Sequence, residues 1–93
     1  MKLRYTERSK DDLEYSTIWY EKQQRGLGLE FLNCIEKSIL LIIENPTMYR
    51  YFHSNFRGCV ISKFPFVIYF TIEENEIVVH SIFDSRQDPV KRP

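Results

Sequence analysis

Hydrophobic residues between positions 56 and 83 fall into three runs that read as strands. The runs cover 56–63, 66–72 and 77–83, and each is rich in β-branched and aromatic residues. Phe64-Pro65 separates the first two runs, and Glu73-Glu74-Asn75-Glu76 separates the last two. The pattern predicts a three-stranded antiparallel meander around which the rest of the chain is organised.

The second of these runs is hydrophobic on both sides of the strand. Phe66, Ile68 and Phe70 alternate with Val67 and Tyr69. Because successive side chains of a strand point to opposite faces, a strand of this kind is covered on both faces. We expect the chain's own helices to cover one face and a second polypeptide to cover the other.

Two helices are predicted ahead of the meander. The first spans about 8–25; Thr6 or Ser9 could cap it, Ser9 and Asp12 resemble a capping box, and Gly26 would end it. The second spans about 29–45 and stops before Pro46, because the residue before a proline avoids the helical region. It carries a wide hydrophobic stripe through Phe31, Ile35, Ile39 and Ile42. The short connection predicts an antiparallel helical hairpin.

The remaining segments complete the expected order. Residues 2–6 alternate as a short edge strand with Leu3 and Tyr5 facing inward, and residues 47–55 form a short strand or an irregular segment. Residues 84–93 are polar and form an exposed tail. The chain is therefore expected to be one domain, 1–93, with an α+β fold of order β-α-α-β-β-β. Its helical hairpin packs on one face of a mostly antiparallel sheet.

Composition and charge narrow the class of function. The 93 residues carry 13 basic and 13 acidic side chains, so the protein lacks the excess positive charge of a nucleic-acid-coating protein. No secretory signal is evident at the N-terminus, and the longest apolar run, 39–43, is too short to cross a membrane. Cys34 and Cys59 lack metal-ligand spacing and read as reduced thiols, so we expect a cytoplasmic protein without metal or cofactor.

Several short motifs follow one another in a characteristic order. They are Asp12-Leu13, Trp19-Tyr20-Glu21, Gly26-Leu27-Gly28 with Phe31-Leu32, Asn45-Pro46, Arg57, Phe64-Pro65-Phe66 with Tyr69, and Arg86 with Asp88-Pro89. Their order and spacing over nearly the whole chain resemble the RelE/ParE superfamily, the toxin halves of bacterial toxin–antitoxin pairs. The resemblance implies a toxin that inhibits growth, takes part in plasmid stabilisation and is neutralised by a cognate antitoxin.

Departures from the superfamily pattern indicate which branch the chain resembles. The stretch 65–68 has no arginine, and Asp84 and Gln87 stand where the C-terminal motif usually has a histidine and an arginine. The resemblance is therefore closer to ParE, whose members are described as poisoning DNA gyrase. The alternatives are a RelE-like endonuclease that cleaves mRNA at the ribosome, and a non-toxic member that only binds antitoxin. Either a homodimer or a heterotetramer with the antitoxin is compatible with the resemblance.

Candidate site residues follow from these readings. A nuclease needs a base, an acid and a cation for the phosphate, and the residues available for those roles are Arg57, Lys63, His80 and Arg86. His80 could equally be structural. Arg57 could instead pair with Asp84 or Glu76. The residues expected to contact a partner are Tyr15, Trp19, Arg57, Phe66, Tyr69 and Arg86. Tyr15 and Trp19 could alternatively pack on the second helix or on 47–55.

Overall fold

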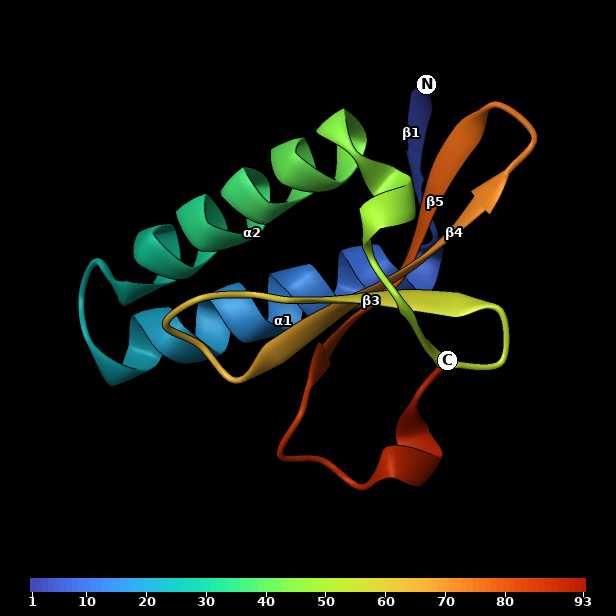
Figure 1. Ribbon diagram of the computed structural model, residues 1–93. Coiled ribbons are helices and arrows are strands. Elements are labelled where there is room, and N and C mark those ends of the chain that lie inside the picture. The colour runs from blue at the N-terminus through green and yellow to red at the C-terminus, as the bar shows by residue number, and fades with distance from the viewer.

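The computed structural model describes residues 1–93 and contains one five-stranded sheet, two α-helices and two short 3-10 helices (Figure 1). The elements in chain order are β1 Lys2–Tyr5, α1 Glu7–Gln23, α2 Leu27–Glu44, η1 Pro46–Met48, β2 Tyr51–His53, β3 Phe56–Val60, β4 Phe66–Glu73, β5 Glu76–Asp84 and η2 Pro89–Lys91. The strand order is β1-β5-β4-β3-β2, with β1 parallel to β5 and all other pairs antiparallel. The predicted α+β fold, the meander and the edge position of β1 are confirmed.

The helical hairpin covers one face of the sheet, as predicted. The central core contains 14 buried residues, drawn chiefly from α2 and from the inward positions of β4 and β5. Phe31, Ile35 and Ile42 are each no more than 1% exposed. Burial of hydrophobic surface at about 25 cal/mol per Å² makes this layer the main stabilising contribution to the fold. Of the two β1 residues expected to face inward, Tyr5 packs against this core, whereas Leu3 stays 36% exposed.

The ends of the two helices differ in part from the prediction. Thr6 caps α1, because its hydroxyl accepts a hydrogen bond from Ser9 N. Asp12 does not complete a capping box; it turns instead toward β5. Gly26 begins α2 rather than ending α1, and its φ of +89° is one that a glycine adopts without strain. The Glu21 carboxylate accepts hydrogen bonds from Gly26 N and Gly28 N and so fixes the turn between the helices.

The second face of the sheet is not free for another polypeptide, and that prediction is wrong. Val67, Tyr69 and Phe83 form a small buried cluster on this face and are 3–6% exposed. Phe52 and Phe56 from this chain pack over the cluster, and the Phe52 and Tyr69 rings lie 5.8 Å apart. The cover is therefore supplied by the β2–β3 hairpin: Phe52 of β2 lies in the segment 47–55 that the sequence leaves open, and Phe56 begins the predicted strand that became β3.

The C-terminal segment is exposed, as expected, but it is also anchored. After β5 it forms η2 and returns toward β2 (Figure 1). His53 Nε2 lies 2.8 Å from the Pro93 carbonyl oxygen, and the Arg8 guanidinium donates to the Lys91 carbonyl. Neither α1 nor α2 has the length and hydrophobicity that a membrane-spanning segment needs.

Candidate functional site

A groove of about 440 Å³ lies between α1 and the outer edge of β5, and we call it the edge groove. One wall is the exposed side of α1, the floor is the end of the sheet, and the far side is the start of the C-terminal segment. Its lining residues are Arg8, Asp11, Asp12, Tyr15, Ser16, Trp19, Tyr20, Phe66, Ile82, Phe83, Asp84, Arg86 and Gln87. Four of the six residues predicted to contact a partner meet here, namely Tyr15, Trp19, Phe66 and Arg86.

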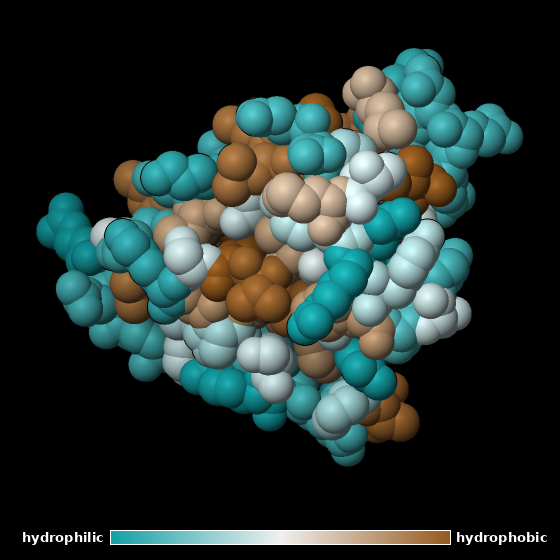
Figure 2. Space-filling model, viewed as in Figure 1, coloured by the Kyte–Doolittle hydropathy of each residue, from teal (hydrophilic) through white to brown (hydrophobic).

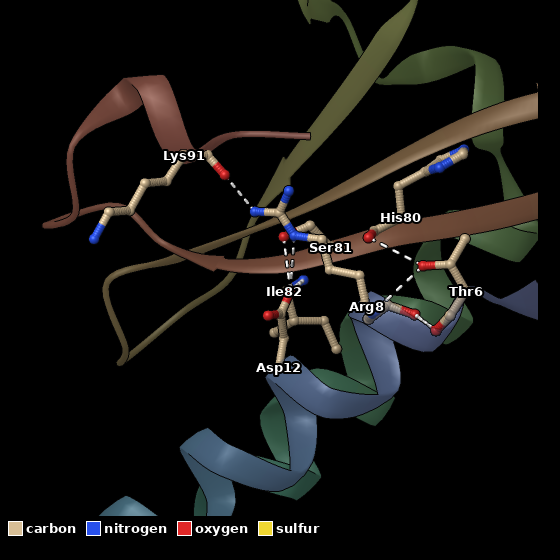
Figure 3. Close-up of polar contacts among 8 residues, drawn as sticks. Thr6, Arg8, Asp12, His80, Ser81, Ile82 and Lys91 are labelled. Atoms are coloured by element: carbon tan, nitrogen blue, oxygen red, sulfur yellow. Dashed lines mark hydrogen bonds and ion pairs between the residues drawn. The ribbon is translucent and has the colours of Figure 1, made fainter.

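The edge groove exists because β1 is shorter than the strand beside it. β1 pairs with β5 only as far as Tyr5 opposite Val79, whereas β5 continues to Asp84. Beyond that point the first turns of α1 approach the β5 edge, as Figure 3 shows. The Thr6 hydroxyl donates to the His80 carbonyl at 3.1 Å, so the chain satisfies the first part of the free edge itself.

Asp12 holds the floor of the edge groove to α1. Its Oδ2 accepts hydrogen bonds from Ser81 Oγ at 2.8 Å and from Ile82 N at 3.1 Å (Figure 3). Arg8 Nε lies 3.9 Å from the same oxygen. Ser81 is fully buried, so its hydroxyl needs this carboxylate as a partner. Asp12 thereby fixes the distance between the helix and the strand edge.

The α1 wall of the edge groove is aromatic and accessible. Tyr15 is 71% exposed and Trp19 41% exposed, whereas Tyr20 is buried. The Trp19 and Tyr20 rings pack edge to face with centroids 5.1 Å apart, which holds the indole against the helix. Large aromatic side chains that stay exposed beside a groove are typical of a protein-binding surface.

The charges around the edge groove are mostly paired within the chain. The Arg86 guanidinium donates two hydrogen bonds of 2.7 and 3.0 Å to the Asp84 carboxylate. These bonds hold the pKa of Asp84 below its ordinary value. The Asp12 carboxylate accepts hydrogen bonds from Ser81 and Ile82 of β5. Asp11 lines the groove without an ion pair, so the groove has one uncompensated negative charge.

The other two predicted partner residues lie elsewhere. Tyr69 is 3% exposed under the β2–β3 hairpin. Arg57 pairs with neither Asp84 nor Glu76: its Nη1 donates to the Tyr49 carbonyl at 2.6 Å, and its guanidinium lies 4.3 Å from the centre of the Tyr51 ring. Gly58 follows Arg57, and the space above it is filled by the Phe52 ring rather than by a ligand.

The four residues considered for a nuclease site are not brought together. Arg57 pairs with Phe70 and so faces the helical layer, whereas His80 contacts Phe56 and Thr71 on the opposite face. Lys63 lies in the β3–β4 connection, 3.9 Å from Glu30 of α2, and Arg86 is at the edge groove. Four groups on different faces and ends of a sheet cannot act on one phosphate.

The His80 side chain contacts Thr71 and Glu73 of the neighbouring strand β4, which is typical of a structural histidine. Its Nε2 lies 2.8 Å from Thr71 Oγ1 and 3.6 Å from Glu73 Oε2. The Thr71 hydroxyl is 2.6 Å from Glu73 and donates to it, so His80 Nε2–H donates to the threonine oxygen. Burial lowers the pKa of His80 despite the opposing effect of Glu73, which favours the neutral imidazole. Both cysteines are free, and burial raises the pKa of Cys59.

A second exposed hydrophobic surface lies over α2, where brown atoms gather in Figure 2. Leu40 and Leu41 on this helix are 66% and 52% exposed. None of the predicted site residues lies on this surface. The edge groove therefore remains the best candidate site, because it combines exposed aromatic side chains with an unpaired sheet edge.

The sequence indicated the aromatic wall of the edge groove and Phe66 in its floor, but not the contact between Asp12 and β5. The sequence pattern predicts a capping role for Asp12 and an ordinary strand position for Ile82. One signal was available: a strand predicted over 2–6 cannot cover the whole length of one predicted over 77–83 when a helix begins immediately afterwards. That mismatch in length predicts a free edge at the end of the last strand.

Comparisons with known proteins agree with the fold. The family model described as the ParE toxin of the type II toxin–antitoxin system, parDE, matches residues 3–89. A solved structure described as the chromosomal ParDE TA system from P. aeruginosa is similar in fold, with a TM-score of 0.78 and 18% identity, over 90% of this chain and 95% of that chain. No curated protein matches the chain.

Proposed function

The chain belongs to the ParE toxin family of type II toxin–antitoxin systems, and from this premise we propose that it is the toxin of such a module. A cognate antitoxin binds it in the edge groove and holds it inactive. Free of antitoxin, the toxin acts on DNA gyrase in the cytoplasm and stops growth.

The edge groove is the observation that carries the antitoxin part of this proposal. It offers two exposed aromatic rings, Tyr15 and Trp19, beside a strand edge that this chain leaves open. Proteins recognise extended or helical segments of partners at such surfaces, with main-chain hydrogen bonds for affinity and pockets for side chains. An antitoxin segment lying here would cover the exposed rings and complete the sheet.

Gyrase is the proposed target because of the branch of the superfamily that the chain resembles. The alternative, RNA cleavage at the ribosome, needs a cation and an acid–base group at one phosphate. Arg57 and His80 lie on opposite faces of the sheet, and Arg86 is bound to Asp84. This separation favours a toxin that acts by binding a protein over one that cleaves RNA.

Inducible expression in a bacterium, with and without the antitoxin, tests the proposed function. We expect filamentation and a DNA-damage response without antitoxin, and normal growth when the antitoxin is present. Rapid arrest of translation with cuts inside codons would instead support the RelE-like nuclease, and the variants R57A and R86A would then test its site. Normal growth without antitoxin would support a non-toxic family member and contradict the proposal.

The stoichiometry of the toxin–antitoxin complex is a separate measurement. Light scattering on the purified complex, and on the toxin alone, distinguishes a heterotetramer from a toxin homodimer.

The toxin alone has an exposed edge groove, and we expect antitoxin binding to protect Tyr15 and Trp19 from solvent. Quenching of the Trp19 fluorescence by acrylamide should therefore decrease in the complex, and Trp19 is the only tryptophan in the chain.

A further inference from the structure

The floor of the edge groove contains two backbone groups that have no partner strand, namely the Ile82 carbonyl and the Asp84 N–H. The Ile82 N–H points away from β4, because it donates to Asp12. Phe66 of β4 pairs with Asp84, and its carbonyl points away from β5, because it accepts from Ile61 N. The backbone groups of Asp84 are therefore not bonded to Phe66 and point away from β4. Backbone groups alternate along an antiparallel strand, so the Ile82 carbonyl and the Asp84 N–H also point outward. β1 ends opposite Val79 and reaches neither group.

The two free groups define how a partner segment can pair with this edge. In antiparallel pairing, one edge residue offers both its N–H and its carbonyl to the residue opposite. Here Ile82 N–H is taken by Asp12, and the Asp84 carbonyl accepts from Gln87 N at 3.0 Å. In parallel pairing, one incoming residue donates to the carbonyl of position i and accepts from the N–H of position i+2, which are the two groups that remain free.

We propose that the edge groove binds one residue of an extended antitoxin segment, running parallel to β5, between the Ile82 carbonyl and the Asp84 N–H. This inference rests on the proposed function, since the antitoxin supplies the segment. The bound residue cannot be proline, because its N–H is required. The segment pairs with β5 beyond Val79, where the pairing of β1 with β5 ends.

The side chains around this backbone clamp define the chemistry of the segment. Trp19 on the α1 wall and Phe66 in the floor both line the groove, so the segment carries a large hydrophobic side chain on that side. Asp11 is the one groove charge without an ion pair, so a lysine or arginine of the segment lies near it. The partner segment is therefore extended, hydrophobic and basic.

Calorimetric titration of the toxin with its purified cognate antitoxin tests the clamp. The variant D84P removes both the carboxylate and the amide hydrogen, whereas D84A removes only the carboxylate. We expect D84P to bind about tenfold more weakly than D84A, because one main-chain hydrogen bond is lost. Equal affinity of the two variants would overturn the clamp and leave the antitoxin role intact. Failure of the unmodified toxin to bind would overturn both.

Amide hydrogen exchange gives a test that does not depend on how D84P folds. In the free toxin the Asp84 amide should exchange fast, while the Phe83 amide, which faces β4, is protected. Antitoxin binding should slow Asp84 exchange at least about tenfold and leave Phe83 unchanged. An Asp84 amide that stays unprotected in the complex contradicts the proposal. The variant D11K should also weaken binding, and its effect should decrease with added salt.

Discussion

Replacing Asp12 with alanine tests whether this carboxylate holds α1 to the β5 edge. The substitution removes the hydrogen bonds from Ser81 Oγ and Ile82 N and leaves the fully buried serine hydroxyl without a partner. An unsatisfied buried polar group costs about 1–3 kcal/mol. Ile82 N borders the open groove, where water can replace the lost acceptor. We therefore expect the free energy of unfolding to decrease by about 2 kcal/mol.

Urea denaturation measures this change directly. At an m-value of about 2 kcal/mol/M, a loss of about 2 kcal/mol lowers the midpoint by about 1 M urea. The adjacent exposed carboxylate provides a matched control, because Asp11 forms no ion pair; D11A should change stability by less than about 0.5 kcal/mol.

A double-mutant cycle shows whether the effect passes through the serine. S81A removes the buried hydroxyl, so D12A should be less damaging in an S81A background, with a coupling energy of about 1 kcal/mol. If D12A behaves like D11A, or if D12A and S81A are simply additive, Asp12 does not hold this edge. Either result would refute the role of Asp12 in fixing the distance between α1 and the β5 edge.

Three further predictions concern the turn between the helices, the second face of the sheet and the partly buried His80. E21A should lose about 1–2 kcal/mol, because Gly26 N and Gly28 N lose their acceptor, whereas E14A on the same helix should lose less than about 0.5 kcal/mol by urea denaturation. G58A should lose about 1–3 kcal/mol, because an added Cβ would lie 2.6 Å from the Phe52 ring; an unchanged thermal midpoint would show that the ring is not packed there. Burial lowers the pKa of His80, so the unfolded chain takes up the proton first and stability falls as pH drops below about 6.5; H80Q should flatten this slope in stability measured from about pH 7 to pH 5.

Much of the fold follows from hydrophobic periodicity. The runs at 66–72 and 77–83 became β4 and β5 because strands with large hydrophobic residues must be buried, and the stripe through Phe31 and Ile42 placed α2 against them. These elements carry most of the buried surface, so local pattern and tertiary packing agree there.

The cover of the second face could not be assigned from the same pattern. A strand that is hydrophobic on both faces must be covered twice, but its sequence does not specify which chain supplies the cover. The cover comes from Phe52 and Phe56. Phe52 lies in β2, which is only three residues long and gives almost no periodic signal, and Phe56 is the first residue of β3. Gly58 was the available clue, because the space above it accommodates the Phe52 ring.

The edge groove could not be predicted in full from the sequence, because it includes a contact between distant parts of the chain. Asp12 and Ile82 are 70 positions apart, and no local rule predicts that an acidic residue in the first turns of a helix will bind a strand edge. Tyr15 and Trp19 were found because exposed aromatic residues on a helix stand out by themselves. The backbone between Ile82 and Asp84 has no side-chain signature, so only the register of β4 and β5 locates it.

Supercoiling of relaxed plasmid DNA by purified gyrase is the most direct test of the account. We predict that the toxin inhibits the reaction at concentrations near that of gyrase, and that prior mixing with its antitoxin restores supercoiling. Normal supercoiling with the toxin in stoichiometric excess would contradict the central claim.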